Sequence, residues 1–181
     1  MQLSFDTFNI EPIKLTDAWP ICNFIAANED RLKRYFPKTL AQNLTPDLSK
    51  YFVKKKVKKF NLKEEFLFTI KSKKTNQIAG LVYLKTLDWT KKQGEFAYCI
   101  DYQFEGKGIT TKTISVLSDY AFETLGLETL QIIVHKDNLP SLHIAKNCNF
   151  IWIKTLKNEF TPTGENPLNM ELYELYNEIK S

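Results

Sequence analysis

The sequence has 181 residues, enough for one domain with a buried core and too few for two domains of typical size. Its hydrophobic fraction of 43%, with only 6 Gly and 7 Pro, excludes a disordered chain. The formal net charge of +4 is modest, and no apolar run approaches the roughly 20 residues that a membrane-spanning helix requires.

Three cysteines, Cys22, Cys99 and Cys148, are scattered without the spacing of metal ligands. Residues 1–6 lack the basic start and apolar centre of a signal peptide, so we expect reduced thiols in a cytoplasmic protein. Cys99 and Cys148 lie in apolar runs, which favours buried small side chains over nucleophiles.

In chain order, the first predicted element is a strand over residues 5–13. Apolar residues at helical spacing then predict a helix over residues 17–28, with Thr16 or Asp17 as its N-cap. A second helix is predicted over residues 46–60 because its apolar positions also recur at helical spacing.

The second helix carries the one dense basic run of the chain, residues 54–59, in which five of the six residues are lysine. We interpret this run as a solvated helix face. The alternative is electrostatic attraction of an RNA-bearing or phosphate-bearing partner, although no nucleic-acid recognition motif accompanies the charges.

Strands and helices alternate in the rest of the chain. Apolar runs at residues 66–70 and 78–84 predict paired strands joined by a polar turn at 73–76. The later elements are predicted as a strand at 95–100, a helix at 110–125, a strand at 130–134, a helix at 142–147, a strand from Phe150, a loop at 161–167 and a strand at 168–175. This order predicts an α/β or α+β domain with a mixed sheet and helices in separate layers.

The helix at 110–125 is expected to end at Gly126 and to turn one apolar stripe inward. That stripe comprises Ile114, Leu117, Ala121 and Leu125.

The junction between the strand at 95–100 and this helix contains two closely spaced glycines. It reads Gln103-Phe104-Glu105-Gly106-Lys107-Gly108-Ile109-Thr110. Glycines at such a point let the backbone approach a ligand, and the first N–H groups of a helix attract phosphate. A short glycine pattern alone is more often just a tight connection.

Residues beyond this loop strengthen the phosphate-binding interpretation. Gln103, Gly106 and Gly108 match the Gln/Arg-x-x-Gly-x-Gly/Ala loop of acetyl-CoA-dependent N-acetyltransferases, and Asn138 and Ser141 match their second marker. At these positions the chain resembles the GNAT superfamily. Asn149 replaces the glycine that usually closes the following helix, a mild change because Asn tolerates a left-handed backbone.

A further resemblance is to the GNAT branch that acetylates the N-termini of ribosomal proteins. Residues 28–37 look like its Asn-x-x-x-Leu-x-x-Trp-Leu-Pro segment, with Tyr35-Phe36 in place of Trp-Leu. Residues 95–98 look like its Glu-Ile-Gly-Tyr strand. The resemblance implies one GNAT domain over residues 1–181, with a central mixed, mostly antiparallel sheet covered by helices on both faces.

The resemblance also implies a set of cofactor contacts. Acetyl-CoA would bind as a co-substrate through the backbone of the loop, with free N–H groups on the strand at 95–100 serving the pantetheine arm and the thioester oxygen. Lys107 would add a positive charge, or would face solvent as an ordinary surface lysine. The implied cofactor-binding residues are Tyr98, Ile100, Gln103, Phe104, Glu105, Gly106, Lys107, Gly108, Ile109, Thr110, Asn138 and Ser141.

Three residues are candidates for catalysis. Ser141 would protonate the leaving thiolate, although Asn138 or Ser141 would also serve as an ordinary helix cap. Glu159 would act as the base, directly or through a water, or would be a surface charge. Glu95 would line the acceptor site, or would be an ordinary solvent-facing strand residue.

The predicted reaction is direct attack of an amine on acetyl-CoA in a ternary complex. The acceptor implied by the resemblance is a protein N-terminal α-amine, which leaves an association with the ribosome open. Alternatives are a small amine such as an antibiotic, a polyamine or an amino-acid derivative, and a non-catalytic acyl-CoA sensor. His135 and His143 have no partners at ligand spacing, so no metal is expected. Both a monomer and a homodimer remain open.

Overall fold

The computed structural model describes residues 3–177. Within them the chain forms two compact units, residues 3–83 with 98–109, and residues 84–97 with 110–177. Eight strands in the described part of the chain form one sheet in the order β1-β2-β3-β4-β5-β6-β8-β7. The ladders β1–β2, β2–β3, β6–β8 and β7–β8 are antiparallel and β5–β6 is parallel, so the predicted mixed, mostly antiparallel sheet is confirmed.

The first unit begins with a hairpin in place of the single strand predicted over residues 5–13. β1 (Leu3–Phe5) pairs with β2 (Phe8–Pro12) across a turn in which Asp6 has a φ of 42°. β2 then pairs with β3 (Phe66–Ser72). The prediction of one strand was wrong because the turn uses Asp, which tolerates a left-handed backbone, and no glycine marks it.

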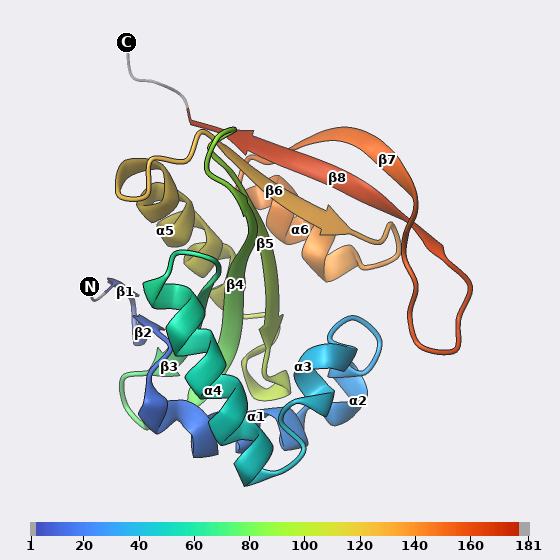
Figure 1. Ribbon diagram of the computed structural model, residues 1–181. Helices are drawn as coiled ribbons and strands as arrows, with labels where there is room; N and C mark the ends of the chain where they lie inside the picture. The colour runs from blue at the N-terminus through green and yellow to red at the C-terminus, as the bar shows by residue number, and fades with distance from the viewer. Residues whose placement is uncertain (1–2, 178–181) are drawn as a thin grey trace. The chain divides into compact units, whose positions relative to one another are not determined.

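The two helices predicted in the first unit are confirmed. α1 (Ala18–Ala27) and α4 (Pro46–Asn61) contact each other, as Figure 1 also shows. The Thr45 side chain caps α4 by accepting a hydrogen bond from the Leu48 N–H. Two short helices, α2 (Glu29–Leu32) and α3 (Pro37–Ala41), lie between α1 and α4 in the sequence and were not predicted.

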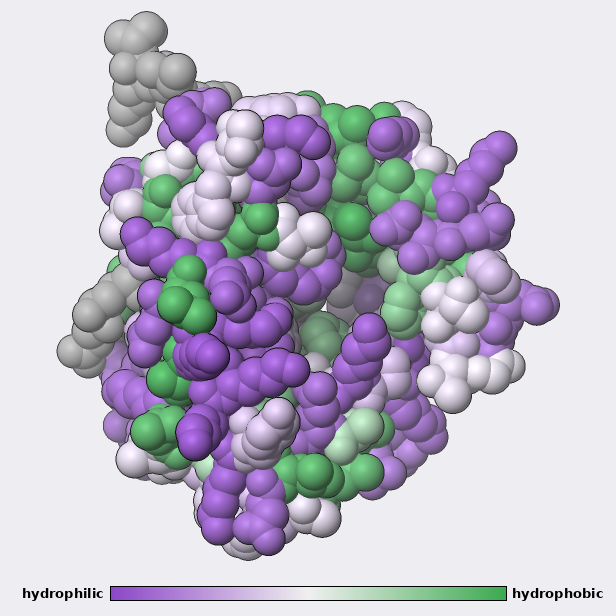
Figure 2. Space-filling view, viewed as in Figure 1, coloured by the Kyte–Doolittle hydropathy of each residue, from purple (hydrophilic) through white to green (hydrophobic). Residues whose placement is uncertain are grey.

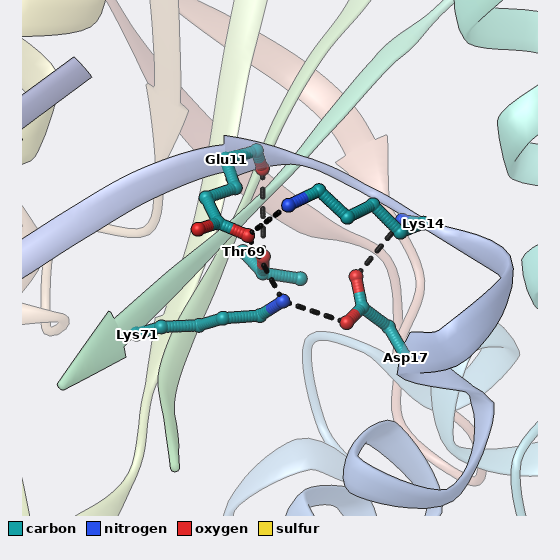
Figure 3. Close-up of polar contacts among 5 residues, drawn as sticks. All are labelled: Glu11, Lys14, Asp17, Thr69 and Lys71. Carbon is teal, nitrogen blue, oxygen red and sulfur yellow. Dashed lines mark hydrogen bonds and ion pairs between the residues drawn. The ribbon is translucent and has the colours of Figure 1, made fainter. Parts of the chain in front are cut away.

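Asp17 occupies the N-cap position of α1, as one of the two predicted caps, but its side chain makes no capping hydrogen bond. Its carboxylate is buried and lies 2.7 Å from Nζ of Lys71 on β3, while its other oxygen accepts a hydrogen bond from the Lys14 N–H (Figure 3). Glu11 completes the cluster, 3.2 Å from Lys71 Nζ. The start of α1 is therefore held by an ion-pair cluster and not by an N-cap hydrogen bond.

Figure 2 shows hydrophilic residues gathered where α4 lies on this face of the molecule. Lys54, Lys55 and Lys58 are exposed, as expected for a solvated face. Lys56 differs, because it pairs with Glu65 and its Nζ lies 4.9 Å from the ring centroid of Tyr83. Burial lowers the pKa of Lys56, and the hydrogen bond that Lys56 donates to Glu65 opposes that shift.

The second unit contains the C-terminal strands and two helices. β6 (Thr129–Val134) pairs with β8 (Leu168–Tyr176), and β8 pairs with β7 (Ile151–Phe160). α6 (Leu139–Asn147) packs on β6 (Figure 1). It is closed by Asn149, whose φ of 62° confirms that asparagine takes the left-handed position usual for glycine.

α5 (Ile109–Glu123) follows the glycine loop, as predicted. Ile114, Leu117 and Ala121 are fully or almost fully buried, which confirms most of the inward stripe. Leu125 lies beyond the end of the helix and is half-buried, so its assignment to the stripe was wrong. Leu127, after the left-handed Gly126, is fully buried instead.

The remaining central strands, β4 (Ile78–Asp88) and β5 (Gln93–Ile100), confirm the predicted strands at 78–84 and 95–100 and extend them. The three cysteines are free thiols. Within residues 3–177, no helix is long and apolar enough to span a membrane.

Candidate active site

The glycine loop connects β5 to α5 through a short 3-10 turn, Tyr102–Phe104. Gly106 and Gly108 both have a φ of +70°, a backbone conformation that strongly favours glycine. Apart from the glycine itself and its two chain neighbours, no described residue has an atom within 4 Å of the position that a Cβ would take at either glycine. The backbone of the loop is therefore open to a ligand on the side where other residues carry a side chain.

Lys107 folds back onto the loop. Its Nζ donates a hydrogen bond to the Gln103 carbonyl at 2.8 Å and lies 5.5 Å from the ring centroid of Phe104. The Phe104 ring in turn meets Phe8 edge to face, with centroids 5.8 Å apart. The loop is thus held by two of its own side chains and by Phe8, and the Lys107 ammonium lies at the loop surface.

The entrance of the loop is anchored on Asp101, which is buried. Its Oδ1 accepts a hydrogen bond from the Gln103 N–H at 2.8 Å, and its Oδ2 accepts one from the Asn28 side chain at 2.9 Å. The Gln103 side chain reaches back to the Tyr102 hydroxyl, 3.1 Å away. This anchoring fixes where the glycine segment begins.

Glu105 is paired with Arg31 of α2. Two guanidinium nitrogens each lie 2.8 Å from a different carboxylate oxygen, which makes the pair bidentate. The hydrogen bond that Arg31 donates to Glu105 lowers the pKa of Glu105 and raises the pKa of Arg31. Glu105 therefore stays ionised, with its charge balanced by a neighbour that sequence analysis did not assign to the site.

β5, the strand before the loop, pairs with β6 over only part of its length. β5 pairs with β6 from Gln93 to Phe96, and the register ends there although β5 continues to Ile100. Tyr98 and Ile100, two predicted cofactor contacts, lie in this last stretch and are half-buried. They share a unit with the glycine loop.

Glu95 lies in the paired part of β5. Its carboxylate forms an ion pair with Lys85 at 2.6 Å and accepts a hydrogen bond from the Thr86 hydroxyl at 3.1 Å. It is therefore engaged with β4 and is not the solvent-facing strand residue of the alternative interpretation.

Asn138 is the N-cap of α6. Its Oδ1 accepts a hydrogen bond from the Ser141 N–H at 3.3 Å. This cap uses the backbone N–H of Ser141, a half-buried residue. The capping interpretation is thus confirmed for Asn138, and the catalytic role of Ser141 stays a prediction.

Glu159 lies on β7 and is exposed. The register between β7 and β8 is irregular between Leu156 and Phe160, and Asn158 has a φ of 53°. This irregularity changes the direction of the strand next to Glu159. Its role as the base stays a prediction.

The side chains of the last two loop residues, Ile109 and Thr110, are buried, so only their backbone would be open to a cofactor. His135 is also buried and its Nδ1 accepts a hydrogen bond from the Asp137 N–H, whereas His143 is exposed. Among the described residues, no group of three or more His, Cys, Asp or Glu side chains is arranged to hold a metal ion.

Two residues of the site, Asn28 and Arg31, were missed as functional candidates. Asn28 is the first residue of the segment 28–37, which resembles the ribosomal-protein acetyltransferase branch. That resemblance did not indicate a role for the Asn28 side chain. Nothing in the local sequence links it to Asp101, which is 73 residues away.

Comparison with known proteins identifies the family. Residues 8–151 match the acetyltransferase (GNAT) domain family. The chain belongs to this family. The family and fold predicted from the glycine loop and the Asn138–Ser141 marker are therefore confirmed.

Curated relatives of similar identity differ in their acceptors. The chain is 33% identical over 87 residues to spermidine N(1)-acetyltransferase of Escherichia coli strain K12, covering 48% of this chain and 47% of that protein. It is 34% identical over 74 residues to a putative ribosomal N-acetyltransferase of Bacillus subtilis strain 168, covering 41% and 40%. The matched segment thus spans less than half of each relative.

A solved structure extends the likeness to the whole fold. The ribosomal-protein-S5-alanine acetyltransferase from Vibrio fischeri superposes with a TM-score of 0.92, covering 100% of this chain and 99% of that one. Its sequence identity is 21%, which supports a shared fold and leaves the acceptor of the acetyltransferase open.

Proposed function

We propose that this protein transfers an acetyl group from acetyl-CoA to a primary amine. The observation that carries the proposal is the pair of open, left-handed glycines, Gly106 and Gly108, at a strand-to-helix connection of a GNAT chain. We further propose that the two units act together as one acetyltransferase domain over residues 1–181, of which 1–2 and 178–181 lie outside the described residues.

The loop fits the phosphate groups of the cofactor. The clearance on the side of both glycines where a Cβ would stand supports binding of a pyrophosphate by the loop backbone and the N-terminus of α5. The end of the β5–β6 ladder at Phe96 supports a role for the following N–H groups toward the pantetheine arm and the thioester oxygen. Acetyl-CoA supplies an acetyl group activated as a thioester.

Residues of the second unit donate and accept the protons that the reaction moves. We propose that the Ser141 hydroxyl donates a proton to the departing sulfur, while Asn138 fixes the backbone on which Ser141 sits. Glu159, or a water that it orients, accepts the proton of the amine. Glu95 orders the neighbouring strand through its contacts with Lys85 and Thr86.

The chemistry favours an α-amine as acceptor. At pH 7 an α-amino group with a pKa near ~8 costs about 1.4 kcal/mol to deprotonate, whereas an aliphatic amine near ~10.4 costs almost ~5 kcal/mol. One exposed carboxylate such as Glu159 suits the easier task. We therefore propose a protein N-terminus as the acceptor, in keeping with the ribosomal relative and with a cytoplasmic site of action. Spermidine is the second candidate, because a spermidine acetyltransferase is among the similar relatives.

The experiment has two stages. Purified protein is titrated with acetyl-CoA by calorimetry, and CoA release is then followed with peptides bearing free N-termini, the same peptides with blocked N-termini, and spermidine. Turnover only on free N-termini supports the first candidate, and turnover on spermidine alone replaces it by the second. Binding without turnover on any amine would make the protein a non-catalytic sensor. Absence of binding would refute the proposal.

A further inference from the structure

The junction between α1 and α2 contacts the entrance of the glycine loop through a buried asparagine. Asn28 is 2% exposed, and its amide nitrogen donates to Asp101 Oδ2 at 2.9 Å and to the Phe24 carbonyl at 2.8 Å. Its amide oxygen accepts a hydrogen bond from the Tyr102 N–H at 3.1 Å. Every polar group of the Asn28 amide is thus engaged, two of its three contacts being with the loop entrance.

These contacts continue into the loop. Asp101 accepts from the Gln103 N–H with its second carboxylate oxygen, and the Asp101 N–H donates to the Ala79 carbonyl at 2.8 Å. The Asp101 carbonyl accepts from the Phe104 N–H at 2.9 Å. Asn28 therefore supports a turn that fixes the direction in which the chain enters the glycine segment.

The glycine segment also carries a negatively charged side chain, Glu105. Glu105 directly precedes Gly106, and a carboxylate beside a pyrophosphate site repels the ligand. Arg31, three residues after Asn28, binds both oxygens of that carboxylate. The pair is partly solvated, with side-chain exposures of 40% for Arg31 and 46% for Glu105.

We propose that Asn28 and Arg31 are positioning residues for the cofactor loop: Asn28 fixes its entrance, and Arg31 holds and neutralises Glu105 so that the loop accepts phosphate. This inference rests on the proposed function, since it assumes that the loop binds the pyrophosphate of acetyl-CoA. It adds that a segment outside the glycine motif determines the affinity for that part of the cofactor.

The test of Arg31 uses a charge cycle. Binding of acetyl-CoA is measured by calorimetry for Arg31→Ala, Glu105→Gln and the double variant, with Lys33→Ala as the matched control. Lys33 follows α2 and also forms an ion pair, but with Asp30 of the same helix and not with a loop residue. We expect Arg31→Ala to raise the Kd about fivefold, because an uncompensated carboxylate then faces the phosphates. Adding Glu105→Gln should restore the Kd to within about twofold, since the repulsive charge is gone.

A truncated co-substrate separates this effect from a structural one. S-acetylpantetheine lacks the pyrophosphate, so its KM and kcat should be the same for Arg31→Ala and for the wild type. The loss of acetyl-CoA affinity in Arg31→Ala should also shrink at high salt, which screens the exposed carboxylate. A Kd equal to that of Lys33→Ala, or a failure of Glu105→Gln to rescue, would overturn the assignment of Arg31. Absence of acetyl-CoA binding by the wild type would instead refute the proposed function.

Asn28 is tested against a second buried asparagine. Asn43 is fully buried and makes comparable contacts, donating to the Thr39 carbonyl and accepting from the Ser49 hydroxyl, each at 2.8 Å. Asn28→Ala and Asn43→Ala should lose similar thermal stability, but only Asn28→Ala should weaken acetyl-CoA binding at a temperature where both are folded. Equal binding by the two variants would reduce Asn28 to a structural residue. If Asn28→Ala does not fold, the Arg31 cycle decides the proposal.

Discussion

Lys71 Nζ lies 2.7 Å from Asp17 Oδ1, and the two side chains are only 7% and 3% exposed. Glu11 adds a second carboxylate to the same ammonium, as Figure 3 shows. This contact joins β3 to the start of α1, the helix that leads to Asn28. The buried cluster therefore supports the segment that holds the glycine loop.

Lys71→Met should destabilise the fold by about 3 kcal/mol, because it leaves the buried carboxylate of Asp17 without its cation. Lys14→Met is the matched control. Lys14 also binds Glu11, at 2.7 Å, but is 55% exposed, so its loss should cost less than about 1 kcal/mol. Chemical denaturation followed by circular dichroism measures both. Equal losses for the two variants would show that burial of the pair is not what matters.

The same cluster predicts a loss of stability in acid. Hydrogen bonds from Lys14 and Lys71 lower the pKa of Glu11 below 4.5 against the opposing effect of burial. A carboxyl whose pKa is lowered by folding contributes stability above its unfolded pKa and loses it as the pH falls through the folded value. The free energy of unfolding should therefore drop below pH 4.5 less steeply in Glu11→Gln than in the wild type. Parallel curves for the two proteins would contradict this.

The raised pKa of Lys71 predicts how the free energy of unfolding changes at alkaline pH. Burial alone would lower its pKa, but hydrogen bonds to Asp17 and Glu11 outweigh burial and raise the pKa above 10.5. The contribution of Lys71 is therefore complete below 10.5 and is lost as the pH rises through its folded pKa. In Lys71→Met, stability should change less between neutral and strongly alkaline pH than in the wild type, as measured by denaturation at each pH.

Gly106→Ala tests the glycine loop directly. Alanine at a φ of +70° costs about 1 kcal/mol and puts a methyl group on the open side of the backbone. Gly126→Ala is the control, since Gly126 has a φ of +73°, is equally open and follows the other end of α5. Both variants should lose similar stability, while acetyl-CoA binding by calorimetry should weaken only in Gly106→Ala. Normal binding by that variant would argue against phosphate contact at Gly106.

Ser141→Ala separates catalysis from helix capping. The cap uses the Ser141 N–H, which alanine retains, so α6 and the affinity for acetyl-CoA should be preserved. Loss of a proton donor should lower kcat by about 100-fold. Steady-state kinetics with the best acceptor gives the answer, and unchanged turnover would remove Ser141 from the proposed chemistry.

Cys99 and Cys148 should react slowly with alkylating reagents in the folded protein. Burial raises the pKa of Cys148 to about 11 and that of Cys99 to about 12, so little thiolate is present near neutral pH. Labelling with iodoacetamide, read by mass spectrometry, should be slow on both residues in native protein and fast after unfolding. Rapid native labelling of Cys148, whose Sγ donates to the Thr111 carbonyl, would contradict this.

Much of the fold and part of the site were predictable because their signals are local. The periodicity of α4 and α5, the glycines at the β5–α5 junction and the Asn138 cap each depend on residues within one or two turns. The left-handed conformation of Asn149, with a φ of 62°, is also a local feature, because it follows from the need to close α6. By itself the sequence therefore determined the family, the order of the elements other than the first hairpin and the two short helices α2 and α3, and the place of the glycine loop.

Only the tertiary structure decided which polar groups meet. Asp17 has the residue type of an N-cap, yet it pairs with Lys71, 54 positions away. Asn28 meets Asp101 at a separation of 73 residues, and Arg31 meets Glu105 at 74. Such contacts depend on strand register and on the path of the chain between elements, which residue type and local spacing do not encode. A buried polar side chain needs a partner, and the fold selects which distant residue supplies it.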